Sequence, residues 1–105
     1  MDGLYIVTIE ALPLPGSPAA ETYGGAYINV YAKEPSESAA LETASREVAE
    51  AGWHSQSIEK VVLVTREDFV DDSDGLVYFE QAQIDGIVVV VNTYPNQADE
   101  DDVRN

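Results

Sequence analysis

The stretch "SESAALETASREVAEAG", residues 36–52, carries the strongest secondary-structure signal in this 105-residue chain. Its apolar residues recur at helical spacing and form one stripe, made of Leu41, Ala44, Val48 and Ala51. Ser36 follows Pro35 and is typical of a helix N-cap, while Gly52 is typical of the residue that ends a helix. The pattern predicts a helix over residues 36–51.

The only tryptophan and the only histidine of the chain, Trp53 and His54, come directly after this helix. A lone histidine beside a lone tryptophan invites a catalytic interpretation. However, a residue two positions beyond the C-cap commonly packs back on the last helical turn, which here means Trp53 against Val48. A histidine near a helix C-terminus is normally solvated and gains a little from the helix dipole. We therefore interpret the pair as a helix end, with ligand stacking by Trp53 as the alternative.

Four strands are predicted from runs of β-branched and aromatic residues with a period of two. They span residues 4–12, 26–33, 58–66 and 87–94. Residues 13–25 contain three prolines and three glycines and are expected to form an irregular loop.

A second helix is predicted over residues 76–85, with Asp74 as its N-cap and Gly86 just past its end. The alternative is a strand, because Asp85 and Gly86 also form a strong hairpin signal. The helix is favoured because the segment "EQAQ" is poor in strand formers.

The resulting β-β-α-β-α-β order predicts an α+β fold, a two-layer sandwich of ferredoxin-like style with a four-stranded sheet and two helices on one face. If the strands on either side of the first helix share the sheet, they should run parallel. Residues 1–95 are expected to form a single α+β domain, and residues 96–105 an acidic disordered tail.

Charge is the most unusual global property. Twenty Asp and Glu residues against five Lys and Arg give a net charge of −15. Such a surface repels nucleic acids and anionic membranes and attracts basic proteins. The chain has no cysteine, which excludes disulfides and thiol catalysis and suits the cytoplasm. The first thirteen residues have no basic segment and are interpreted as a strand rather than a signal peptide.

Three of the four strands are apolar on both faces, although two helices on one face would cover only that face. The uncovered side is predicted to be an interface, with a homodimer preferred over another protein partner. The candidate partner-binding residues are Tyr27, Asn29, Tyr31, Val61, Leu63, Val88 and Val90. The alternative is that residues 13–25 or the tail fold back over this side.

No catalytic motif is present: the sequence lacks GxSxG, a phosphate-binding glycine loop and any cysteine. The acidic run "DDSDG", residues 71–75, fails the EF-hand pattern, since Val70 and Gln81 fall at ligand positions. A single histidine without cysteine is not a typical zinc set. We therefore predict no catalytic residue, no metal and no cofactor.

The favoured function is that of a small, acidic, non-enzymatic interaction protein. The opening β-β-α order with a helix rich in small residues is similar to several small bacterial antitoxin and immunity-type folds, which implies an inhibitor of a basic protein partner. One alternative is a small enzyme or ligand-binding protein on a dimeric scaffold, with a pocket lined by Tyr5, Trp53 and His54. The other is a structural homodimeric accessory subunit.

Overall fold

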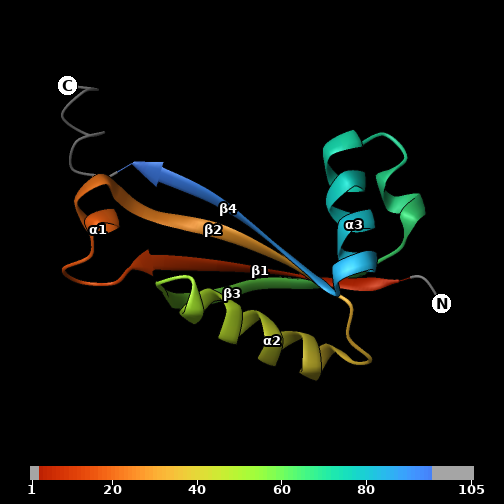
Figure 1. Ribbon diagram of the computed structural model, residues 1–105, viewed down its shortest axis with the longest axis horizontal. Helices are drawn as coiled ribbons and strands as arrows, with labels where there is room; N and C mark the ends of the chain where they lie inside the picture. The colour runs from red at the N-terminus through yellow and green to blue at the C-terminus, as the bar shows by residue number, and fades with distance from the viewer. Residues whose placement is uncertain (1–2, 96–105) are drawn as a thin grey trace.

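The structure, a computed structural model, describes residues 3–95 and contains one four-stranded antiparallel sheet (Figure 1). Its strands are β1 (Leu4–Pro13), β2 (Tyr23–Ala32), β3 (Trp53–Val64) and β4 (Ile87–Pro95), in the spatial order β3-β1-β2-β4. The two longer helices are α2 (Glu37–Glu50) and α3 (Ser73–Asp85), and the two short ones are α1 (Pro18–Thr22) and the 3-10 helix η1 (Arg66–Phe69). The predicted α+β class and the four-stranded sheet are confirmed, while α1 and η1 are additions to the predicted order and the tail 96–105 lies outside the described residues.

The predicted crossover is present. β1 pairs antiparallel with both β2 and β3, so β2 and β3 run parallel to each other on either side of it. Helix α2 makes the connection between them, as expected for a parallel crossover.

Helix α2 begins and ends as its sequence predicts. The Ser36 hydroxyl accepts a hydrogen bond from the Ala39 N–H at 3.2 Å. At the other end Gly52 has a φ of 92°, a left-handed conformation that glycine adopts without steric cost. Trp53 packs against the apolar cluster that contains Val48, and is partly buried there.

Three boundary predictions are wrong. The loop 13–25 is not irregular, because β1 extends to Pro13, β2 starts at Tyr23, and α1 lies between them, beginning at a proline whose missing N–H costs nothing in a first turn. The N-cap of α3 is Asp72 rather than Asp74, since its Oδ1 accepts from the Gly75 N–H at 3.0 Å.

The third error concerns β3, which starts at Trp53 rather than at residue 58. Its polar first half is tolerated because β3 is an edge strand and this half is largely exposed. Two register shifts against β1 place one extra residue in β3 each time, Glu59 and Gln56. These bulges hide the regular alternation that sequence analysis relies on.

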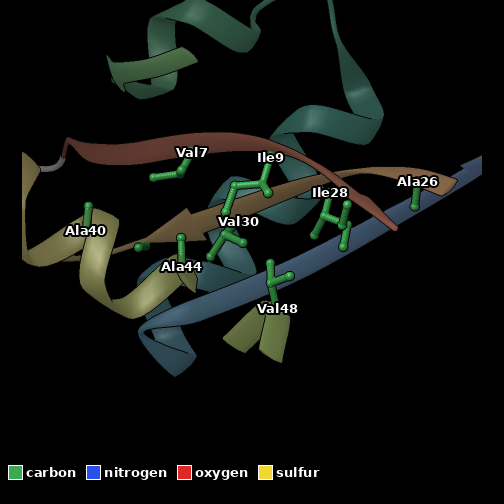
Figure 2. Packing of buried hydrophobic residues seen from close by; sticks show 10 residues of the cluster. Val7, Ile9, Ala26, Ile28, Val30, Ala40, Ala44 and Val48 are labelled. Atoms are coloured by element: carbon green, nitrogen blue, oxygen red, sulfur yellow. The ribbon is translucent and has the colours of Figure 1, made fainter. Parts of the chain in front are cut away.

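The two longer helices lie on opposite faces of the sheet, so the prediction that both cover one face is wrong and the ferredoxin-like two-layer arrangement is not confirmed (Figure 1). Helix α2 closes one cluster through Ala40, Ala44 and Val48, which pack with residues such as Val7 and Ile28 (Figure 2). Helix α3 closes a second cluster, made of Leu4, Tyr31, Val64, Phe69, Phe79 and Ala82. Because these strands are apolar on both faces, both faces of the sheet need cover. Helix α2 covers one face, and α3 covers part of the other.

Helix α3 is too short to cover its face. Thirteen residues of helix span about 20 Å, whereas ten residues of strand span about 33 Å. Figure 1 shows α3 standing at one end of the sheet, beside the start of β4 and the start of β1. Within residues 3–95, neither of the two longer helices lies over the other half of this face.

Candidate partner-binding face

The uncovered half of the α3 side of the sheet is the candidate site, and we call it the open face. The strand registers place its residues side by side, because Thr8 lies between Asn29 and Lys60, and Glu10 lies opposite Tyr27. Its members are Thr8, Glu10, Tyr27, Asn29, Lys60 and Tyr94.

A cleft of about 270 Å³ lies where the open face meets η1 and the N-cap of α3. Its apolar walls include Ile6, Val62 and Phe69, and its polar groups come from Thr8, Asn29, Lys60 and Asp72. The Thr8 hydroxyl donates a hydrogen bond to Asn29 Oδ1 at 2.7 Å, which fixes both side chains across the central strand pair.

Tyr31 lies in the wall of this cleft and is nearly buried. Its ring packs between Tyr78 and Phe69, with ring centroids 5.8 and 6.4 Å away. Burial, followed by the nearby Asp72 carboxylate and Tyr78, raises the pKa of Tyr31. The side chain therefore stays neutral and contributes packing to the cleft rather than acid–base chemistry.

The far end of the open face holds two tyrosines and a carboxylate. The rings of Tyr27 and Tyr94 lie 5.6 Å apart at a tilt of 42°. The Tyr94 hydroxyl donates to Glu10 Oε2 at 2.9 Å and so links β4 to β1 across β2. This reach depends on Gly25, because a Cβ there would come within 2.6 Å of Tyr94 Cζ and 2.8 Å of the Ala11 carbonyl oxygen.

Partial burial, then the hydrogen bond to Glu10 and its negative charge, raise the pKa of Tyr94 to about 12. The folded chain thus holds this proton more tightly than the unfolded chain, whose tyrosine pKa is about 10. The higher pKa of Tyr94 in the folded chain therefore stabilises the fold. This stabilisation is complete below about pH 10 and is lost as the pH rises towards 12.

We expect Glu10→Gln to lower the pKa of Tyr94, because glutamine keeps a hydrogen-bond acceptor but carries no charge. A tyrosine absorbance titration measures this shift, and Glu42→Gln, at an exposed position on α2, is the control. An unchanged Tyr94 titration in Glu10→Gln would mean that the Tyr94–Glu10 contact does not exist in solution.

The predicted partner-binding residues do not share one surface. Tyr27, Asn29, Tyr31, Val88 and Val90 lie on the α3 side, because Tyr31 pairs with Val88 and Asn29 with Val90. Tyr31 is buried beneath α3, and the two valines pack against the same cluster. Tyr27, at 44% exposure, is the large side chain of this set that remains available on the open face.

The other two members of that set, Val61 and Leu63, are on the α2 side of the sheet. Val61 pairs with the core residue Val7, and Leu63 pairs with Tyr5. Val61 packs against the α2 cluster, while Leu63 is 52% exposed on the edge strand.

The structure does not bring the predicted pocket residues together. Tyr5 lies opposite Leu63, and Trp53 lies opposite Pro13, so they occupy the two ends of the β1–β3 pair. Eight residues of strand separate them by about 26 Å. His54 lies next to Trp53 in β3, but it is exposed and points to the other face of the sheet.

Sequence analysis missed Glu10, Tyr94, Thr8, Lys60 and Asp72 as residues of one surface. Glu10 and Tyr94 are 84 positions apart, and only the strand order brings them together.

Within residues 3–95, no group of three or more His, Cys, Asp or Glu side chains could hold a metal ion. In the same part of the chain, no helix is long and apolar enough to cross a membrane.

Comparison of the chain with protein-family models, with curated proteins and with solved structures found no match. The case for a function therefore depends on the geometry and chemistry of the open face.

Proposed function

We propose that this chain is a non-enzymatic interaction protein that binds a basic segment of a protein partner on the open face. The observation that carries the proposal is the pair of the exposed Tyr27 and the half-buried Tyr94, with the Glu10 carboxylate beside it, on a part of the sheet face that α3 leaves uncovered.

The chemistry of this surface suits an arginine or lysine side chain. Tyrosine ring faces attract cations, and a carboxylate next to them supplies a charged hydrogen-bond acceptor. Residues 3–95 carry fifteen acidic and four basic side chains, so the long-range field also draws a basic partner towards the domain. Acidic charge of this kind mainly accelerates association, which is what an immunity- or antitoxin-like inhibitor of a basic cytoplasmic protein requires.

A labelled arginine-rich peptide provides a defined probe, with binding followed by fluorescence anisotropy. We expect Tyr27→Ala and Glu10→Gln each to weaken binding by about tenfold, which corresponds to ~1.4 kcal/mol. Glu42→Gln removes the same charge from the exposed side of α2 and should change affinity by less than about twofold. If all three variants lose affinity equally, attraction is nonspecific and the open face is not the site.

The cleft favours a second candidate, a small-molecule ligand. Its volume of about 270 Å³ is slightly below the range of drug-sized sites, and its polar groups are concentrated at Thr8, Asn29 and Lys60. A ligand bound there would depend on Lys60 rather than on Tyr27. Screening of small anionic and neutral compounds against Lys60→Ala and Tyr27→Ala would therefore distinguish the two functions.

A further inference from the structure

The two edges of the sheet differ in how they are protected against pairing with another strand. On β3, the bulges at Glu59 and Gln56 interrupt the regular ladder, and Glu59 and Lys60 place charges along the edge. Bulges and charged side chains are the usual devices that prevent edge-to-edge association. The β3 edge is therefore protected.

The β4 edge has neither device. Its register with β2 is unbroken from Ile87 to Thr93, and residues 87–95 contain no charged side chain. Four consecutive valines give this strand a high β-propensity. A regular, apolar, uncharged edge strand is a surface that pairs readily with another strand.

One hydrogen bond shows which backbone N–H and C=O groups of β4 point away from β2. The Lys33 N–H donates to the Gly86 carbonyl at 2.9 Å, which makes Lys33 and Gly86 a hydrogen-bonded pair at the end of the β2–β4 ladder. Such pairs alternate along an antiparallel ladder. The N–H and C=O groups that point away from β2 therefore belong to Ile87, Val89, Val91 and Thr93.

We propose that β4 pairs antiparallel with β4 of a second copy of this chain, joining two four-stranded sheets into one of eight strands. A second copy fits this edge better than a basic partner, because β4 has no carboxylate to meet a cation. Because β4 itself carries no charged side chain, the shared edge adds no contact between like charges to the pairing of two acidic chains. This pairing differs from a face-to-face dimer and does not depend on the function proposed for the open face.

The first test is the oligomeric state of the full chain. It is measured by sedimentation at concentrations from the micromolar range to about 1 mM. We expect the wild-type chain to dimerise and Val91→Lys to weaken dimerisation by about tenfold or more, because each copy then places a charge at the shared edge. Leu63→Lys is a matched control: Leu63 is 52% exposed and Val91 40% exposed, on the same side of the sheet but at opposite edges. A wild-type monomer throughout this range would overturn the proposal, as would equal effects of the two variants.

Amide hydrogen exchange tests the geometry of the dimer separately. We expect the Val89 and Val91 N–H groups to exchange more slowly as the concentration rises, since dimerisation gives them hydrogen-bond acceptors. The Val61 and Leu63 amides, which the same alternation directs away from β1 at the β3 edge, should show no such change. A dimer in which Val89 and Val91 keep exchanging rapidly would be formed through another surface and would contradict β4 pairing.

Discussion

Replacing Phe79 with alanine is expected to lower the free energy of unfolding by about 3–5 kcal/mol. Phe79 is fully buried, and its ring centroid lies 5.4 Å from that of Phe69. It is the largest fully buried side chain of the structure, and it joins α3 to the cluster around Leu4 and Tyr31. Because a domain of this size is stable by only about 5–15 kcal/mol, the loss is a large share of the total. Urea unfolding measures it.

Val77→Ala is the control within the same helix. Val77 is 62% exposed on α3, so its replacement should change the free energy of unfolding by no more than about 0.5 kcal/mol. A loss below ~1 kcal/mol for Phe79→Ala, or equal losses for both variants, would show that α3 does not pack on the sheet through Phe79.

Gly25→Ala is expected to destabilise the chain by about 1–3 kcal/mol and to disrupt the far end of the open face. The new Cβ would overlap the Tyr94 ring and the Ala11 carbonyl oxygen, so the ring must leave its place above β2. Tyr94 would then lose its hydrogen bond to Glu10, and its pKa should fall from about 12 towards its ordinary range. Urea unfolding measures the loss of stability, and a tyrosine absorbance titration measures the change in the pKa of Tyr94.

A double variant tests whether overlap with the Tyr94 ring causes the destabilisation by Gly25→Ala. With Tyr94→Ala already present, one of the two overlaps is gone, and Gly25→Ala should then cost less than it does in the wild-type chain. Equal costs in both backgrounds would mean that the tyrosine ring does not lie over Gly25.

Local features of this fold could be predicted from the sequence because local physics determines them. Ser36 and Gly52 mark the ends of α2 through hydrogen bonding and left-handed backbone geometry, and neither depends on the rest of the chain. The alternation in β2 likewise identifies the residues that α2 buries, since Ala26, Ile28, Val30 and Ala32 have no exposed surface.

The placement of the helices could not be predicted in the same way. Apolar residues on both faces of β1 show that both faces need cover, but they do not show which helix covers which face. The connection through α3 passes from one edge of the sheet to the other, and a connection of this kind can cross either face. Bulges in β3 add to the difficulty by interrupting its alternation.

The candidate site was predictable only in part for the same reason. Tyr27 and Asn29 were recognisable as polar positions of the one strand that alternates between apolar and polar residues, and both lie on the open face. Tyr94 and Glu10 meet only because β4 and β1 flank β2, a relation that no short-range pattern encodes.

The central claim is that the open face binds a basic protein segment. Its most direct test is to map amide chemical shifts while the arginine-rich peptide is added to the isotopically labelled chain. We predict that the shifts concentrate at Thr8, Tyr27 and Asn29. Shifts concentrated instead around the exposed carboxylates of α2, such as Glu42 and Glu50, would contradict the claim.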